Sequence, residues 1–165
     1  MIENNAAYAW ILTPDQNWSV FFPLHDEDFG KQEKAGQSDW VPFVPGMLGN
    51  ISGMIENIES PFETVIRESE EERRIRVAGE NVSNGFPEVQ GSQKRSGREI
   101  NFSAVGCQLV LTDSNLEYLK TTQSGLQYVS HDHLPDFLVK EARLLRPFIR
   151  VAGWEIIKRQ LLVRK

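Results

Sequence analysis

The chain has 165 residues, a formal net charge of −5, 40% hydrophobic residues and 25% charged residues. This size and balance are typical of a globular protein, and we expect residues 1–165 to form a single domain with a real core. The acidic balance argues against tight binding to long nucleic acid, which needs many lysine and arginine contacts with phosphates. No run approaches about 18 apolar residues, so no membrane span is expected. The single cysteine, Cys107, indicates a reducing cytoplasm.

The N-terminal third predicts short strands and loops. Residues 7–13 and 18–22 are rich in apolar and aromatic residues and indicate two strands around a turn. The polar stretch 25–39 is expected to be a loop. Residues 40–55 are apolar but broken by proline and glycine, which favours short strands and tight turns over a helix.

A helix is predicted to begin at Ser60. Ser60 can cap it, Pro61 suits the first helical position, and Glu63 completes a capping box. The helix is expected to run to about Arg73.

The C-terminal half predicts further strands, one long loop and two helices. Residues 79–97 are rich in glycine, serine and asparagine, which favours a surface loop. Pro147 separates two helical patterns. The order of strands, helix, strands and helices indicates an α+β fold or an αβα sandwich. The expected strands cover 75–77, 100–112, 116–121 and, as one more candidate, 126–130, with a turn at 113–115, and the expected helices cover 134–145 and 148–162.

The predicted helix after Ser60 carries three carboxylates on one face. At about 100° per residue, Glu71 and Glu72 fall close to the azimuth of Glu68, whereas Glu70 points nearly opposite. Three like charges on one face repel, so a bound cation is a natural reason to keep them. Hard cations such as Mg²⁺ prefer carboxylate oxygens. A solvated acidic face is the alternative explanation for a glutamate-rich helix.

The spacing around this helix resembles the Nudix box, in the segment Gly53 to Ile75 (GMIENIESPFETVIRESEEERRI). That pattern is Gly, five residues, Glu, seven residues, Arg-Glu, an apolar residue, any residue, Glu-Glu, any residue, Gly and an apolar residue. Every charged position matches. Ser69 stands where an aliphatic residue is usual, and Arg74 replaces the glycine that eases a left-handed turn. Neither departure removes a metal ligand.

The resemblance implies a Nudix-like αβα sandwich with a mixed sheet and a C-terminal helical segment. It also implies Mg²⁺-dependent hydrolysis of a pyrophosphate bond in a nucleoside diphosphate linked to another moiety, with Mn²⁺ as a substitute ion. The partner would be a small nucleotide-type substrate, and selectivity would come from loops outside the box. A non-catalytic Nudix-like domain that binds a nucleotide as a sensor is the second hypothesis. An unrelated α+β protein with an exposed acidic helix is the third.

Site residues follow from the resemblance, residue by residue. Glu68, Glu71 and Glu72 would be metal ligands, and the backbone carbonyl of Ser52 a further one. Arg67 would orient a glutamate through a charged hydrogen bond. Glu59 would support the loop before the helix or bind a metal indirectly. The general base would be Glu68 or an acid outside the box. Candidates for such an acid are Glu117, Asp132 and Asp136.

Several residues outside the box have both a functional and a simpler structural interpretation. His131-Asp132-His133 resembles half of a metal site, but a surface loop or helix cap is favoured because no third ligand has recognisable spacing. Lys94, Arg95 and Arg98 are expected in a solvated loop rather than on phosphate. The C-terminal helix is expected to pack on the sheet or to form part of a homodimer contact. Trp40, Phe43 and Phe86 are candidates for stacking on a base, and burial in the core is the favoured interpretation for Trp40 and Phe43.

Overall fold

The protein is described by a computed structural model that covers residues 4–23, 48–95, 97–141 and 147–163. Within these ranges it contains one mixed sheet and helices on both of its faces. The elements in chain order are β1 (Asn4–Leu12), β2 (Trp18–Pro23), β3 (Leu48–Gly49), β4 (Ile51–Met54), α2 (Pro61–Arg73), the 3₁₀ helix η1 (Gly79–Asn81), β5 (Val82–Arg95), β6 (Arg98–Val110), α3 (Asp113–Thr122), β7 (Gln127–Ser130), α4 (Leu134–Lys140) and α5 (Pro147–Val163).

Strand β1 lies at the centre of the sheet. It pairs in parallel with β6 along its whole length and antiparallel with β2 and β4. The strand order is β3-β2-β1-β6-β5, with β4 added to β1 and β7 added to β2. A parallel pair needs a long crossover connection, and here the segment between β1 and β6 contains the acidic helix α2. The crossover therefore sets this helix against one face of the sheet.

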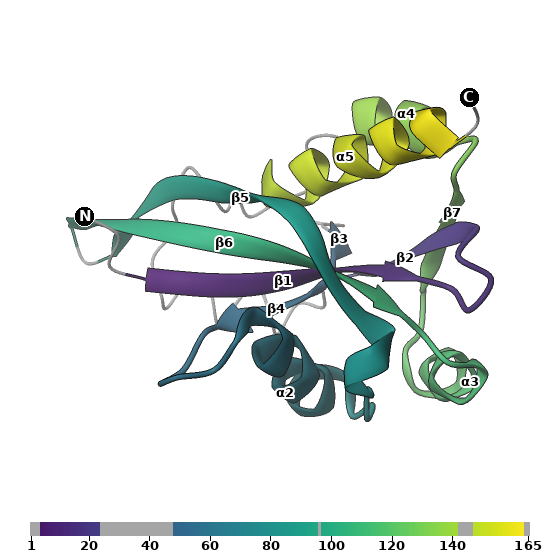
Figure 1. The fold of residues 1–165 in the computed structure, drawn as a ribbon, viewed down its shortest axis with the longest axis horizontal. Helices are drawn as coiled ribbons and strands as arrows, with labels where there is room; N and C mark the ends of the chain where they lie inside the picture. The colour runs from purple at the N-terminus through teal and green to yellow at the C-terminus, as the bar shows by residue number, and fades with distance from the viewer. Residues whose placement is uncertain (1–3, 24–47, 96, 142–146, 164–165) are drawn as a thin grey trace.

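The hydrophobic core has two parts because β1 is buried on both faces. Tyr8 and Trp10 pack with Ile149 of α5 on one face. Ala9 and Ile11 pack with Val65 of α2 on the other. Figure 1 shows α4 and α5 above the sheet and α2 and α3 below it. This αβα arrangement confirms the predicted α+β class, the mixed sheet and the C-terminal helical segment.

Two predictions between residues 75 and 97 are wrong. Residues 75–77 have no regular structure, and 82–95 form strand β5 instead of a surface loop. Strand β5 pairs with β6 from Val82 to Arg95, with register shifts around Phe86. It stands at the end of the strand order, where proline, glycine and bulges are tolerated because one side of the strand needs no ladder partner. Its glycine, serine and asparagine content therefore led to the prediction of a loop where the structure has a strand.

The predicted strand at 116–121 is also wrong, because these residues belong to helix α3. The Thr112 hydroxyl accepts a hydrogen bond from the Asn115 backbone N–H at 3.0 Å, and Asn115 Oδ1 accepts one from the Thr112 backbone N–H at 3.4 Å. This capping box begins a helix at Asp113. The residues interpreted as a turn, 113–115, are its first turn.

The remaining predicted elements agree with the structure where it describes them. Strands β1, β2 and β7 and helices α2 and α5 begin and end within a few residues of their predicted bounds. Helix α4 ends at Lys140, earlier than expected. The predicted loop at 25–39, and Trp40 and Phe43, lie outside the described residues. No helix in the described ranges is both long and apolar enough to cross a membrane.

The end of α2 explains the departure from the box at Arg74. Arg74 has φ 59° and ψ 32°, the left-handed conformation, and its N–H donates to the Glu70 carbonyl at 3.0 Å. A residue with a Cβ pays a steric penalty there that glycine avoids. We therefore expect Arg74→Gly to raise the free energy of unfolding by about 0.5–1 kcal/mol, measured by urea denaturation. Arg74→Ala keeps the Cβ and should show no such gain; an equal gain in both variants would contradict the backbone explanation.

Candidate active site

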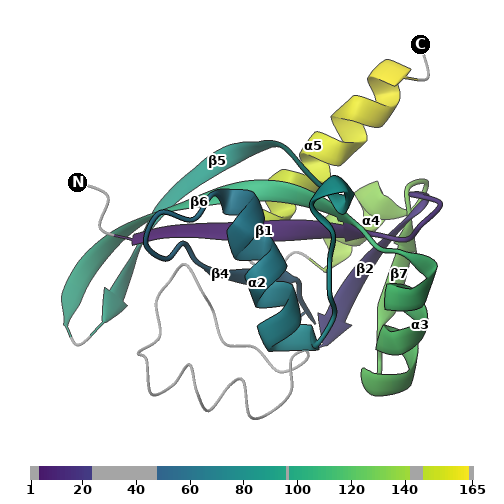
Figure 2. The same cartoon turned by 60° about the horizontal axis from the view of Figure 1, so that its bottom comes forward.

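Strand β4 and helix α2 are in close contact at Gly53 and Glu68. Gly53 lies opposite Ala7 in the β1–β4 pair, on the side of the sheet that α2 covers. A Cβ built on Gly53 would collide with the carboxylate of Glu68. The glycine is therefore required by the close approach of this side chain, and it fixes where the Glu68 carboxylate can lie. Figure 2 shows α2 running in front of the sheet beside β4.

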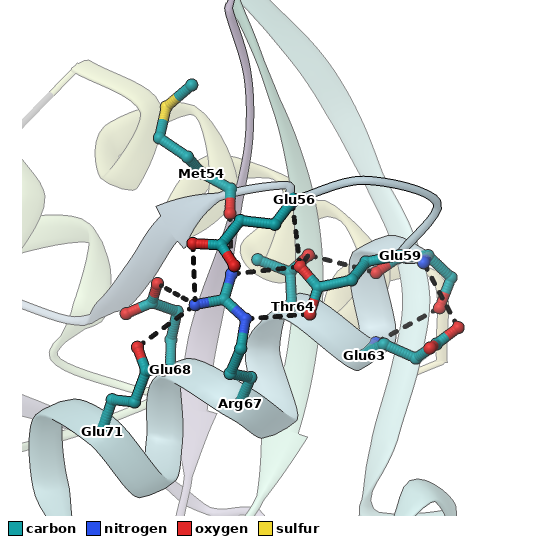
Figure 3. Close-up of polar contacts among 9 residues, drawn as sticks. Met54, Glu56, Glu59, Glu63, Thr64, Arg67, Glu68 and Glu71 are labelled. Atoms are coloured by element: carbon teal, nitrogen blue, oxygen red, sulfur yellow. Dashed lines mark hydrogen bonds and ion pairs between the residues drawn. The ribbon is translucent and has the colours of Figure 1, made fainter.

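Arg67 is the centre of a polar cluster that joins α2 to the loop after β4 (Figure 3). Its guanidinium donates to both carboxylate oxygens of Glu59, at 2.8 and 3.1 Å. It also donates to Glu68 at 2.9 Å, to Glu71 at 3.2 Å and to the Met54 carbonyl at 2.8 Å. The planar guanidinium can make all these bonds at once because it carries five donors in a fixed geometry. One cation thus holds three carboxylates in place.

Glu59 is held by further hydrogen bonds besides those from Arg67. Its Oε1 accepts the Glu56 backbone N–H at 2.9 Å and the Thr64 hydroxyl at 3.2 Å. The bonds from Arg67, with the smaller contribution of Glu56, lower the pKa of Glu59 from its ordinary 4.5 to about 2. In turn, the bond to Glu59 raises the pKa of Arg67 above its usual range. This pair is therefore fully ionised at neutral pH.

The lowered pKa of Glu59 predicts a pH-dependent stability. The folded pKa of about 2 lies below the ordinary 4.5 expected in the unfolded chain, so the contribution of Glu59 is complete above pH 4.5. It is lost as the pH falls from 4.5 towards 2. The melting temperature of wild type should exceed that of Glu59→Gln at pH 7, and the difference should shrink between pH 4.5 and 3. A difference that stays constant over this range would contradict the ion pair.

Glu72 and Glu68 form a second pair within the site. Desolvation by the surrounding protein, a hydrogen bond that protonated Glu72 donates to Glu68, and charge repulsion from Glu68 raise the pKa of Glu72 to about 8. The Glu72 residue is exposed as a whole, so the contact with Glu68 is a firmer cause of the raised pKa than desolvation. A backbone hydrogen bond from Ser52 acts in the opposite direction. Two carboxylates close enough to share a proton are therefore assembled beside the backbone of Ser52.

The donors at this position fit a hard divalent cation. Glu68 and Glu72 offer carboxylate oxygens, which are preferred ligands of Mg²⁺, while the Ser52 backbone N–H donates to Glu72. A cation would also relieve the repulsion that raises the pKa of Glu72. In the described ranges, no group of three or more His, Cys, Asp and Glu side chains is already arranged around a metal position. Glu71 instead contacts Arg67, and its side chain is 59% exposed.

The structure brings the predicted box residues together but not the candidates outside the box. Glu117 is exposed on α3, where its charge contributes to a raised pKa of Tyr128. Asp136 lies in the first turn of α4, on the opposite face of the sheet from α2. Asp132 lies in the turn before α4. None of the three is part of the Arg67 cluster.

The other predicted residues have structural environments. His133 shares a hydrogen bond with Ser130 at 2.7 Å, as expected for a turn before a helix. Phe86 is 6% exposed, belongs to the core and lies under the Arg159 guanidinium at 4.7 Å. Arg98 lies at the β5–β6 hairpin. A cavity of about 570 Å³ between the β1–β2 turn, α3 and β7 is lined by none of the predicted site residues.

Sequence reasoning did not identify two groups that support the site. The buried Thr64 hydroxyl bonds Glu59, and the Met54 carbonyl bonds Arg67. Neither residue type is marked by the box pattern, and a backbone carbonyl leaves no signal in a sequence. The Met54 contact depends on how β4 packs against α2, whereas the Thr64 contact forms between the start of α2 and the loop before it.

Comparison with known proteins identifies the fold. No family model and no curated protein matches the chain in sequence. Among solved structures, the E. coli dihydroneopterin triphosphate pyrophosphohydrolase matches with a TM-score of 0.59 and 12% identity, over 96% of this chain and 99% of that one. RenU, a Nudix hydrolase from M. smegmatis, matches with a TM-score of 0.51 and 10% identity, over 99% and 90%. The C. elegans Ap4A hydrolase matches with a TM-score of 0.50 and 14% identity, over 94% and 99%. The chain has the fold of the Nudix hydrolases.

Proposed function

We propose that the protein is a Mg²⁺-dependent Nudix pyrophosphohydrolase. It would hydrolyse a pyrophosphate bond in a nucleoside diphosphate linked to another moiety. The observation that supports this most is the carboxylate cluster itself, in which Arg67 fixes Glu59, Glu68 and Glu71 while Glu72 contacts Glu68. The spacing of the Nudix box and the fold agree with the same reaction. A cytoplasmic location and a homodimer stay predictions.

The proposed roles follow from these contacts. Glu68, Glu71, Glu72 and the Ser52 carbonyl would hold the metal, which when bound neutralises charge on the pyrophosphate and lowers the pKa of water. Arg67 and Glu59 fix the loop and helix on which these donors stand. Glu68 is our candidate general base because Gly53 leaves room for its carboxylate. It would take a proton from the water that forms the new bond to phosphorus, in line with the departing phosphate oxygen.

A nucleotide-binding domain without catalysis is the second candidate. The two departures from the box favour it, because Ser69 is fully buried within α2 and Arg74 ends that helix in a strained conformation. Both can alter how the carboxylate face sits on the sheet.

The two candidates are separated by a substrate panel. We expect Mg²⁺ with one or more of ADP-ribose, NADH, dinucleoside polyphosphates, nucleoside triphosphates and capped RNA to release a nucleoside monophosphate, and EDTA to stop the reaction. Product analysis identifies the bond that is cleaved. Thermal stabilisation by nucleotide without turnover, in Mn²⁺ as well as Mg²⁺, would favour the binding domain.

The contact between Gly53 and Glu68 gives a further prediction. In Gly53→Ala the new Cβ displaces the Glu68 carboxylate, which is at the end of a flexible side chain, so the fold should survive. We expect kcat to fall at least about tenfold, because a small misplacement of a catalytic group is enough for such a loss. Gly79→Ala is the matched control, since nothing lies within 4 Å of a Cβ there. Equal activity in both variants would show that the position of Glu68 is irrelevant to turnover.

A further inference from the structure

Asn50 is a buried amide that lacks hydrogen-bond partners. It is 8% exposed, and neither its Oδ1 nor its Nδ2 has a partner. The other five buried polar residues of the described ranges each make a side-chain hydrogen bond. They are Thr13, Ser19, Thr64, Ser69 and Ser103.

An unsatisfied buried amide destabilises the folded protein. In the unfolded chain both atoms of the amide bond to water, and burial without replacement partners loses these bonds. A leucine of similar size would avoid the loss. The amide therefore does not stabilise the fold through hydrogen bonds. A ligand with a matching donor and acceptor would satisfy both of its polar atoms.

Asn50 lies on the strand segment that leads into the candidate site. Gly49 of β3 pairs with β2 and Ile51 of β4 pairs with β1, so Asn50 is the single residue between β3 and β4. Ser52 then bonds Glu72, and Gly53 contacts Glu68. At a strand rise of about 3.3 Å per residue, Gly53 is only about 10 Å along the chain from Asn50. A nucleotide can span this distance from its phosphates to its base.

We propose that Asn50 is a specificity-determining residue that binds the nucleobase of the substrate. This inference rests on the proposed function, since it takes the phosphates to lie at Glu68 and Glu72. An amide presents one donor beside one acceptor, and a base edge with the complementary pair satisfies both; adenine, with N7 next to its N6 amino group, is such a base. A sugar phosphate or a lipid pyrophosphate offers no such planar edge. The substrate class is therefore a pyrophosphate that carries a nucleobase.

The test compares stability and ligand binding in Asn50→Leu. The variant should melt at least about 2 °C higher than wild type, because the unsatisfied amide is gone. Its Kd for AMP, measured by NMR titration, should rise at least about tenfold, while its Kd for ribose 5-phosphate should stay within about twofold. A residue with a purely structural role is not expected to give a variant that is more stable and yet binds AMP more weakly.

Two further variants complete the experiment. Ser19→Ala removes a buried polar group that has a partner, the indole N–H of Trp10 at 2.8 Å, so it should lower the melting temperature and leave AMP binding unchanged. Asn50→Asp keeps the shape but replaces the donor with an acceptor, and it should weaken AMP binding even if Asn50→Leu does not fold. The proposal is overturned if wild type does not bind AMP, or if the Asn50 variants bind AMP as wild type does. Because AMP binding needs no turnover, absence of hydrolysis in the substrate panel would contradict the proposed function separately.

Discussion

Glu72→Gln is expected to lose nearly all pyrophosphohydrolase turnover while keeping its fold. Glutamine retains the size of glutamate but is a much weaker ligand for a hard cation. Charge stabilisation by a catalytic metal is worth several kcal/mol, and about 1.4 kcal/mol corresponds to tenfold in rate, so we expect kcat to fall at least about a thousandfold. The measurement is nucleoside monophosphate release at saturating Mg²⁺.

Although Glu72→Gln should lose activity, it should be as stable as wild type or more stable at high pH. The folded pKa of Glu72 is raised to about 8 from its ordinary 4.5, so wild type loses stability as the pH rises from 4.5 through 8. Glutamine is neutral throughout and can still bond Glu68. Without metal, the variant should therefore melt at the same temperature as wild type or higher at pH 9. Glu70→Gln, on nearly the opposite face of the same helix, is the control and should change neither property. Full activity in Glu72→Gln would make the proposed metal role wrong.

Arg67→Ala is expected to lose both stability and activity. The substitution removes the donors to Glu59, Glu68 and Glu71 and leaves these carboxylates, with that of Glu56, without their shared cation. The Arg67 side chain is 22% exposed, so the effect should lie between that of a surface pair and that of a buried one, at about 2 kcal/mol in the free energy of unfolding. We expect kcat to fall at least about a hundredfold, because the Glu68 carboxylate loses its fixed position.

Two matched variants identify the reason for such a loss. Arg67→Lys keeps the charge but not the planar set of donors, and it should recover only part of the stability. Arg76→Ala removes an exposed arginine just beyond the helix and should have little effect on either quantity. If Arg67→Lys behaved as wild type in urea denaturation and in turnover, the geometry of the guanidinium would be unimportant.

The fold could be predicted from the sequence where a local signal and the tertiary structure agree. Ser60, Pro61 and Glu63 begin α2 through contacts within one turn, and the structure contains both hydrogen bonds of that capping box. Helix α3 and strand β5 were missed for opposite reasons. The cap at Thr112 looks like a turn because threonine and asparagine favour both. Strand β5 is specified by its pairing with β6, which no local pattern reveals.

The candidate site could be predicted only in part, for a related reason. The helical period places Glu68 and Glu72 on one face, and the structure brings them into contact. The period does not show that Gly53 lies against Glu68, that Thr64 supports Glu59, or that Asn50 is buried without a partner. The Gly53 and Asn50 environments depend on how their strands meet α2 or the sheet, whereas the Thr64–Glu59 hydrogen bond is local but has no sequence signature of its own. The candidates for a general base outside the box, Glu117, Asp132 and Asp136, were chosen without knowledge of which segments lie near α2.

The most direct test of the central claim is a crystal structure of the protein with Mn²⁺ and a non-hydrolysable nucleotide, with anomalous scattering recorded for the metal. We predict an anomalous peak bonded to the carboxylates of Glu68, Glu71 and Glu72 and to the carbonyl of Ser52, with the nucleotide phosphates against the same ion. The absence of a peak at these oxygens while nucleotide is bound, or a peak only elsewhere on the protein, would contradict the account.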